Sequence, residues 1–552
     1  MITRLFITIP FLLMTIYATA QPALAWERRY NGTPDLSDEA VSIAVDAAGN
    51  SYVTGSAFAP NGTLDIVTIK YSPSGQQMWL ESYNGTGNGN DQGAELVLDN
   101  AGNVYVTGYS NNLNSFNDVT TIKYNNSGVL QWVSFHNGAF NNYDQGNALQ
   151  VDANGNVYVV GYVTASNYTY DFVTIKYNSL GVQQWLQTYN GPGDFNDEGK
   201  DIGIDANGNV YVTGYSDTLV NTQPNEDIVL LKYNNSGAFQ WRKVYDGPGH
   251  SYEWSKKLTI DKNNNILVVG YGWTASANGN DYIILKWNPS GNFQWIRSYN
   301  YGPNTFENPA DIITDSLNNV IVTGQGITSS SSATNDYLTV KYNSSGTFQW
   351  ASRYNGPANN DDRGTALALD DSLNIFVTGF SKGTGTLYDC ATVKYDPSGN
   401  QIYALRYNNA NANKDDMGNA IAVRNGDIYV TGKSANLSND DYITLRYSYS
   451  AVGIAENGLK IENLLYIYPN PSNGENISVL FPENLSLNDA KCSINITNAQ
   501  GQIIRTENHK ITLSPDTKNT FSIAISDLKS GLYLLNISAN ELFIGSSKFV
   551  IE

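Results

Sequence analysis

Short runs of alternating apolar and polar residues, separated by turn residues, extend along most of this chain. Residues 94–99 show the alternation clearly, and residues 104–108, 118–124 and 131–135 are further short runs rich in β-branched and aromatic residues. Glycine- and asparagine-rich stretches separate these runs. A period of two that is bounded by such turns is typical of β-strands. This stretch therefore predicts four short strands connected by turns.

The four-strand pattern recurs at a nearly constant spacing. One aromatic position in the last strand of each copy marks the repeat, and successive markers are 53 to 56 residues apart. A fixed period of this length with strong β character is typical of solenoids and propellers. Four strands per repeat indicates a propeller blade. The markers are Trp26, Trp79, Trp132, Trp185, Trp241, Trp295, Trp350 and Tyr403.

The first and last copies are incomplete in complementary ways. Residues 26–31 supply only a fourth strand, whereas the last copy has strands at 420–423, 427–432 and 441–447 and lacks a fourth. Pairing the N-terminal strand with the last copy would satisfy both open edges. The sequence thus predicts an all-β fold, an eight-bladed β-propeller closed by the N-terminal strand and followed by a small Ig-like β-sandwich.

Residues that recur in every copy are expected to serve the architecture. The marker tryptophans should fill the space between packed sheets, so Trp132→Ala would cost about 3–5 kcal/mol if the side chain is fully buried. A cation that recurs in the third strand is expected to form a structural pair or to lie along the surface. Its positions are Lys70, Lys123, Lys176, Lys232, Lys286, Lys341, Lys394 and Arg446.

The domain boundaries follow from changes in this pattern. Residues 1–25 have the basic start, short apolar stretch and small-residue cleavage sites of a signal peptide, so the mature chain should begin at Gln21 or Trp26. The repeats occupy 26–449, and residues 450–463 are predicted to be a linker. Short alternating strands then predict a β-sandwich over 464–552.

Composition narrows the environment of the protein. The formal net charge of −19 argues against nucleic acid as a partner, and after residue 25 no segment is long and apolar enough to span a membrane. The two cysteines, Cys390 and Cys492, fall in different predicted domains. A disulfide framework is therefore not expected, and both should be small buried side chains.

The repeats resemble the SBBP family of bacterial β-propeller repeats. The similarity lies in an Asp-x-x-Gly-Asn-x-Tyr-Val-Thr-Gly phrase, seen at 205–214 and, with Val160 in place of Thr, at 152–161. Three later copies, at 261–265, 315–319 and 371–374, lack the turn glycine, so those turns should be less regular. The resemblance implies a fold and no particular activity.

The C-terminal segment resembles the C-terminal sorting domain of the type IX secretion system. Matching residues lie at 468–471, 498–504, 528–533 and 548–550. This resemblance implies export across the outer membrane by the type IX secretion machinery. We therefore expect a secreted, extracellular protein or one displayed on the outer cell surface. The alternative is an ordinary adhesive sandwich domain.

Two carboxylates recur near the longer loops of each copy, one before the first strand and one at the start of the third. They could form a cation-binding ring, because calcium prefers several oxygen ligands, and Ca²⁺ is the one cofactor that the sequence suggests. The alternative, which we favour, is that they cap loop amides. The first set is Asp38, Asp91, Asp144, Asp197, Glu253, Glu307, Asp362 and Asp416, and the second is Asp65, Asp118, Asp171, Asp227, Asp281, Asp336, Asp389 and Asp441.

The fifth copy departs most from the repeat. It contains the three tryptophans outside the marker positions: Trp287, which should be core, Trp273, which should open a loop, and Trp254, which should replace a loop glycine. Exposed aromatics beside a carboxylate suit stacking on sugar rings or peptides. The predicted ligand site is therefore His250, Tyr252, Glu253, Trp254 and Trp273, although local repacking between blades would also explain these residues.

The sequence favours binding over catalysis without deciding between them. No nucleophile–base pair, histidine cluster or nucleotide motif is found, so no catalytic residue is assigned. The main hypothesis is a binding or adhesion scaffold for an extracellular glycan or protein. The alternative is a secreted polysaccharide-acting enzyme with its active site at the channel mouth.

Overall fold

The computed structural model describes two compact units, divided between residues 449 and 450. The predicted linker at 450–463 and residues 1–20 of the predicted signal peptide lie outside the described residues. The described residues are 21–113, 115–220, 223–248, 250–274, 279–301, 305–327, 334–449, 466–468, 470, 472, 475–480, 487–498, 503–513, 520–539 and 542–551.

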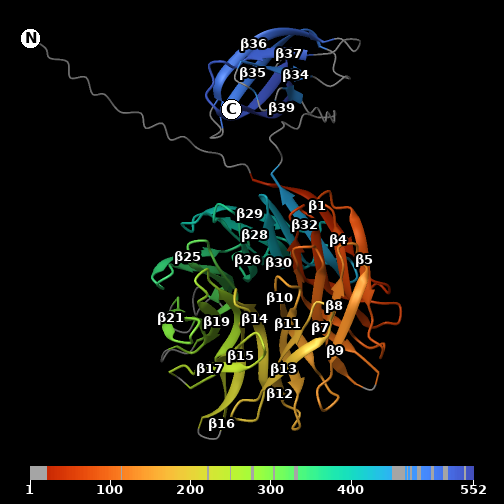
Figure 1. Ribbon diagram of the computed structural model, residues 1–552, viewed down its shortest axis with the longest axis vertical. Coiled ribbons are helices and arrows are strands. Elements are labelled where there is room, and N and C mark those ends of the chain that lie inside the picture. The colour runs from red at the N-terminus through yellow and green to blue at the C-terminus, as the bar shows by residue number, and fades with distance from the viewer. Residues whose placement is uncertain are drawn as a thin grey trace, which may run out of the picture. The chain divides into compact units, whose positions relative to one another are not determined.

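Within its described residues, the first unit forms eight four-stranded antiparallel sheets, seven of which are consecutive in the chain (Figure 1). The first four are β2–β5 (Glu39–Val45, Ser51–Phe58, Leu64–Tyr71, Gln77–Tyr83), β6–β9 (Gln92–Leu98, Val104–Asn111, Asn117–Tyr124, Leu130–His136), β10–β13 (Gln145–Val151, Val157–Thr164, Tyr170–Tyr177, Gln183–Tyr189) and β14–β17 (Asp197–Ile204, Val210–Val220, Gln223–Tyr233, Phe239–Tyr245).

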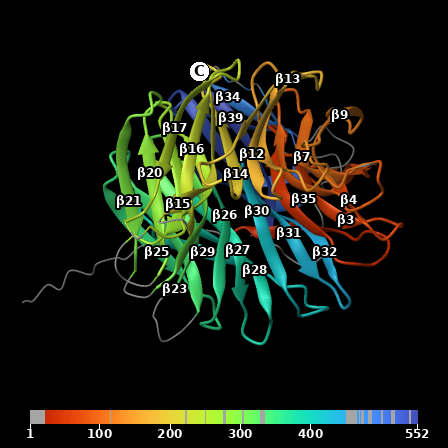
Figure 2. The same cartoon turned by 90° about the horizontal axis from the view of Figure 1, so that it is seen from below.

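The remaining sheets follow in chain order around the unit (Figure 2). The first strand of each sheet contacts the first strand of the next, from β2 to β30, and β30 also contacts β2. This arrangement is consistent with a β-propeller. These sheets are β18–β21 (Trp254–Ile260, Ile266–Gly272, Asp281–Trp287, Phe293–Tyr299), β22–β25 (Glu307–Thr314, Val320–Ile327, Asn335–Tyr342, Phe348–Tyr354), β26–β29 (Asp362–Leu369, Ile375–Lys382, Tyr388–Tyr395, Gln401–Tyr407) and β30–β32 (Asp416–Arg424, Asp427–Ala435, Asp440–Ser448) with β1 (Ala23–Tyr30).

The N-terminal strand belongs to the last sheet. Strand β1 pairs antiparallel with β32, with Trp26 opposite Arg446 and Tyr30 opposite Tyr442, and the strand order is β1-β32-β31-β30. The strand begins at Ala23, three residues before the predicted start at Trp26. Both β1 and β32 thereby satisfy backbone groups that would otherwise be open at a sheet edge.

The marker aromatics lie between neighbouring sheets, but most of them are only partly buried. Trp26 and Trp295 are 8% exposed, whereas Trp132 is only half-buried, because the last strand of each sheet is the outermost one. The indole N–H of Trp132 donates to the carbonyl of Ser179 in the next sheet at 3.1 Å. The marker side chains pack against the cores between sheets, as predicted, and because Trp132 is not fully buried the cost of Trp132→Ala should lie below 3–5 kcal/mol.

The recurring cation has the structural role that was expected. The Lys70 Nζ lies 4.9 Å from the Tyr52 ring centroid and donates to the backbone carbonyl of Asn126 at 3.1 Å. Lys286 forms a buried ion pair of 2.8 Å with Asp261, an aspartate of the turn between the first two strands of its sheet. These cations thus connect strands within a sheet and join one sheet to the next.

The second unit consists of two antiparallel sheets that share one core. The larger has the order β36-β35-β38-β39 and the smaller β33-β34-β37. Ile477, Ile494, Ile523, Leu535 and Phe549 contribute to the common core from both sheets. The strands are β33 (Tyr466–Tyr468), β34 (Asn476–Leu480), β35 (Leu487–Asn498), β36 (Ile503–Leu513), β37 (Thr520–Ala524), β38 (Gly531–Ala539) and β39 (Leu542–Ile551).

Both cysteines are free and buried, Cys390 in the first unit and Cys492 in the second. Burial raises the pKa of the Cys390 thiol to about 12, so that thiol stays protonated. Within the described parts of the chain, no helix has the length and apolar character needed to cross a membrane.

Candidate functional site

The loop that joins each sheet to the next starts with the same side-chain contact in most copies. An asparagine that follows the last strand donates to a side chain four residues later, as Asn137 does to Asn141 at 2.6 Å. In the fifth copy this asparagine is replaced by Asp246, whose carboxylate contacts His250 Nδ1 at 2.6 Å. His250 has a φ of 44°, close to the 48° of Asn141. The two loops therefore share this backbone conformation but carry side chains of different chemistry.

The carboxylates before the first strands are buried and cap these loops. Asp91, for example, accepts hydrogen bonds from the backbone N–H of Gly85 at 2.8 Å and of Asn111 at 2.7 Å. The pKa of Asp91 is nevertheless raised to about 7, chiefly by burial and in smaller part by the charge of the nearby Asp65. The amide-capping role favoured at the sequence level accounts for these contacts.

Each capping carboxylate also interacts with the carboxylate at the start of the third strand of the preceding sheet. The two negative charges are close enough to raise a pKa within each pair. The eight pairs are Asp441–Asp38, Asp65–Asp91, Asp118–Asp144, Asp171–Asp197, Asp227–Glu253, Asp281–Glu307, Asp336–Asp362 and Asp389–Asp416.

Three pairs are compensated by an arginine located three residues after the marker aromatic. Arg29 lies 3.1 Å from Asp441, Arg406 lies 2.8 Å from Asp389, and Arg353 lies 3.9 Å from Asp336. The same position in the other five copies is occupied by Ser82, Phe135, Thr188, Val244 and Ser298.

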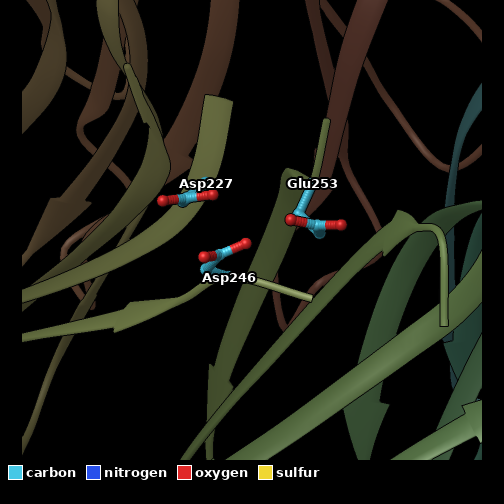
Figure 3. Close-up of side chains that lie close together, drawn as sticks. All are labelled: Asp227, Asp246 and Glu253. Atoms are coloured by element: carbon cyan, nitrogen blue, oxygen red, sulfur yellow. The ribbon is translucent and has the colours of Figure 1, made fainter. Parts of the chain in front are cut away.

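The fifth pair gains a third carboxylate instead of a cation. Asp227 lies within β16, the third strand of the fourth sheet, Asp246 follows that sheet's last strand, and Glu253 precedes β18. One potential ligand atom from each of the three lies within 4.8 Å of the others, and Figure 3 shows the three carboxylates turned toward one space. Asp227 and Glu253 are buried, whereas Asp246 is exposed.

Within this acidic cluster, Glu253 has a raised pKa. Its pKa is raised to about 8, chiefly by burial; the charges of Asp227 and Asp246 also raise it, and the Gly247 N–H opposes the rise. Its Oε2 accepts the Gly247 N–H at 3.0 Å. The backbone N–H of Trp273 also interacts with the carboxylate and lowers its pKa.

The aromatic part of the predicted site lies beside this cluster. Trp254 stacks on Tyr215 with ring centroids 5.6 Å apart and contacts Tyr271 edge-on at 5.8 Å. Its indole N–H donates to Glu226 Oε2. Tyr252, Trp254 and Trp273 are 56%, 37% and 39% exposed, which leaves three aromatic side chains available to a ligand.

Two details of the sequence interpretation need correction or completion. Trp254 does not replace a glycine: it pairs with Tyr271 inside β18, and Ser255 pairs with Gly270 as Gly199 pairs with Gly214. Trp254 therefore occupies a strand position that the other copies fill with Glu39, Gln92, Gln145, Glu198, Asn308, Arg363 and Met417. Trp273 follows β19 directly, as expected, and Trp287 is core at 4% exposed.

The predicted site residues thus divide between two neighbourhoods. His250 and Glu253 belong to the acidic cluster, whereas Trp254 joins the ring stack. Sequence reasoning missed Asp246, although aligning the loop asparagines would have identified it as the only acidic residue at that position.

A polar cavity between the first strands was also missed. It has a volume of about 270 Å³ and is lined by residues including Glu95, Lys257 and Asp311. Lys257 Nζ lies 3.6 Å from Asp201 and 3.7 Å from Glu95, and these carboxylates raise its pKa. The sequence does mark this cavity. The position that Lys257 occupies in the first strand is charged in only four copies, and Lys257 is the single cation among them.

Comparison with known proteins identifies both parts of the chain. Residues 189–218 match the family described as SBBP, β-propeller repeat, and residues 466–552 match the secretion system C-terminal sorting domain. The chain combines SBBP-type β-propeller repeats with a C-terminal sorting domain. The sorting domain indicates export by the type IX secretion machinery, to the cell surface or beyond.

The similar proteins that extend beyond one repeat are distant in sequence. An uncharacterized WD repeat-containing protein of Acanthamoeba polyphaga mimivirus is 25% identical over 437 residues, which cover 68% of this chain and only 28% of the relative. Similar solved structures are Drosophila Plexin A in complex with Semaphorin 1b (TM-score 0.39, 10% identity, 78% of this chain and 88% of that chain) and a PL25 ulvan lyase (TM-score 0.35, 11% identity, 69% and 95%).

Proposed function

We propose that this protein is an exported binding scaffold, in which an eight-bladed β-propeller closed by β1 presents a ligand site and an Ig-like sorting domain directs export. The β1–β32 pairing and the contact of β30 with β2 support closure. A closed disc of sheets is rigid, and loops held by such a scaffold are suited to binding.

The observation that carries the proposal is the aromatic group of the fifth repeat. Tyr252, Trp254 and Trp273 are exposed together in the only copy that has tryptophans outside the marker positions. Glu226 beside Trp254 adds an acceptor for ligand hydroxyl or amide groups. Aromatic faces next to a carboxylate recognise sugar rings, so a glycan is the ligand class that this geometry fits best.

The carboxylates near this group favour binding over polysaccharide cleavage. An acid–base pair must present two carboxyl groups to the substrate. In the acidic cluster only Asp246 is exposed, since Asp227 and Glu253 are buried. In the cavity between the first strands, Glu95 and Asp201 are paired with Lys257.

The proposal is tested by screening the purified protein on glycan and protein arrays with and without calcium, followed by affinity measurements on variants. Trp254→Ala and Trp273→Ala should each weaken binding of the selected ligand at least tenfold. Tyr143→Ala is the matched control, because Tyr143 is an equally exposed aromatic (48%) in another copy. Unchanged affinity in both tryptophan variants would exclude this site.

A further inference from the structure

A lysine lies at each end of the group of rings that includes Trp254. Lys256 Nζ lies 5.3 Å from the ring centroid of Tyr271, which contacts Trp254 edge-on at 5.8 Å. Tyr215 stacks on Trp254 at 5.6 Å, and Lys200 Nζ lies 5.4 Å from the Tyr215 ring centroid. The contacts therefore run in order from Lys200 through three aromatic rings to Lys256.

Both lysines occupy a position that the architecture does not reserve for a cation. Lys256 is the bulged residue of β18, and the first strand of every sheet has a bulge at the equivalent place. Lysine occurs there only in the fourth and fifth sheets, which are neighbours and carry the ring stack. The other copies have Val41, Ala94, Asn147, Ala310, Thr365 and Asn419. Because alanine suffices in two copies, the fold does not require the ammonium group of Lys256.

Lys256 differs from other polar residues at this position because its donors are not used. Asn147 Nδ2 donates to the Gly199 carbonyl in the next sheet at 2.7 Å. Lys200 forms an ion pair of 2.5 Å with Glu198. Lys256 forms no hydrogen bond or ion pair with any residue that the structure describes, and its contact is the Tyr271 ring. An ammonium group has three donors, and all three are open to a ligand.

The electrostatic surroundings of Lys256 favour an added negative charge. Burial lowers the pKa of the Lys256 ammonium, the charge of Lys200 lowers it further, and Glu198 opposes the shift. Glu198 is already engaged by Lys200 and by the Tyr215 hydroxyl, which donates to it at 2.8 Å. The Debye length at physiological ionic strength is about 8 Å, so the protein's net charge of −19 is largely screened and local groups decide. An acidic ligand group would supply the counter-charge that Lys256 lacks among the described residues.

We infer that the glycan bound beside Trp254 is acidic, and that Lys256 binds its carboxylate or sulfate group while Trp254 contacts the sugar ring. Lys256 and Trp254 both contact Tyr271, so a sugar ring and its acidic substituent can be bound together. This inference rests on the proposed glycan-binding function and names the chemical class of its ligand.

The test measures the affinity of the full chain for two matched pairs of saccharides. One pair is oligogalacturonate and its full methyl ester, and the other is dextran sulfate and dextran, so the pairs distinguish carboxylate from sulfate. The wild type should bind the acidic member of at least one pair about tenfold more tightly, because hydrogen bonds to charged groups are stronger than neutral ones. Raising NaCl to about 1 M shortens the Debye length to about 3 Å and should reduce this preference.

Lys256→Gln is the critical variant, and it should bind the acidic saccharide no better than its neutral counterpart. Lys256→Arg keeps the charge and should retain the preference. Lys382→Gln is the matched control, because Lys382 also lies over a tyrosine ring, at 5.1 Å from Tyr388, but in the seventh sheet. It should leave the preference unchanged. Trp254→Ala should weaken binding of both members of the pair.

Three outcomes would overturn the inference. They are equal affinity of the wild type for both members of each pair, a Lys256→Gln variant that keeps the full preference, and a Lys382→Gln variant that loses as much preference as Lys256→Gln. In each of them, binding that still depends on Trp254 would leave the proposed function intact. Binding of neither member of either pair would also overturn the inference, and the array screen would then decide the proposed function separately.

Discussion

Each marker tryptophan rests against a glycine of the neighbouring sheet, so the two positions depend on each other. Gly181 has a φ of +80°, and a Cβ added there would lie 2.6 Å from Cδ2 of Trp132. Gly62 has almost the same φ, +83°, but a Cβ there would meet nothing within 4 Å. Comparing Gly181 with Gly62 therefore separates the cost of the left-handed backbone from the cost of steric overlap.

Gly181→Ala should therefore destabilise the first unit more than Gly62→Ala. Gly62→Ala should lower the free energy of unfolding only through strain in the left-handed backbone, by about 1–2 kcal/mol. Gly181→Ala adds overpacking and should cost roughly 2–5 kcal/mol in total. Denaturant unfolding of the two variants measures the difference. Equal losses would show that Trp132 moves aside freely and does not hold the interface.

At the scale of elements, β1 comes from the N-terminal part of the chain and completes the sheet that β30, β31 and β32 form near the end of the first unit. Arg29 anchors it through Asp441 at 3.1 Å and through Ser434, whose hydroxyl and carbonyl oxygens accept at 2.7 and 2.6 Å. Trp26 adds a hydrogen bond of 3.0 Å from its indole N–H to the carbonyl of Pro73 in the adjacent sheet.

A chain that starts at residue 32 should unfold at a lower temperature, and a synthetic peptide of residues 21–31 should restore the Tm by adding the missing strand. A peptide with Trp26→Ala and Arg29→Ala should bind at least tenfold more weakly, because it lacks both anchors. Thermal scans with increasing peptide measure the effect. An unchanged Tm after deletion would show that β1 contributes nothing to closure.

Much of this element structure could be predicted because it repeats. Eight copies of one alternating pattern define the strands, and the incomplete first and last copies predict the pairing of β1 with β32. The observed strand ends, such as Ala23, differ from the predicted ones by a few residues, because backbone pairing continues beyond the hydrophobic pattern. The packing of the marker tryptophans between sheets could be predicted, but not how far each is buried, since the pattern does not show which strand is outermost.

The candidate site was only partly predictable. The unusual aromatics stand out against the repeat, so Trp254 and Trp273 were found. Asp246 was missed because an Asn-to-Asp exchange hardly alters the pattern, and its importance appears only when Asp227 and Glu253 are brought beside it. The contacts of Trp254 with Tyr215 and Glu226 join different strands and have no signal in local sequence.

At the scale of the whole molecule, the ring of capping carboxylates should make stability depend on pH. Burial raises the pKa of Asp91 to about 7 and of Glu253 to about 8, above the values near 4 of unfolded chains. Between about pH 4 and pH 8 the native state therefore holds protons that the unfolded chain has released. Burial likewise raises the pKa of Asp38, Asp144, Asp197, Glu307, Asp362 and Asp416.

The free energy of unfolding should consequently fall as pH rises through this window. In EDTA, the Tm of the first unit should drop by roughly 5 °C or more between pH 5 and pH 8.5. Asp91→Asn should reduce the slope, because it removes one of the protons gained on folding. Asp371→Asn, which removes the same charge at an exposed position, should leave the slope as it is. A Tm that stays level or rises with pH in the wild type would contradict this assignment.

The pairing of β1 with β32 also sets the order of events during biosynthesis. The first strand to emerge must wait for a partner that ends at Ser448, more than 400 residues later. At 5–20 residues per second, that interval is about 20–80 s of synthesis. The last sheet therefore stays incomplete until β32 has been made, and the sorting domain at residues 466–552 follows β32 in the chain. The last sheet of the first unit can therefore be completed only late in synthesis, however early the other sheets form.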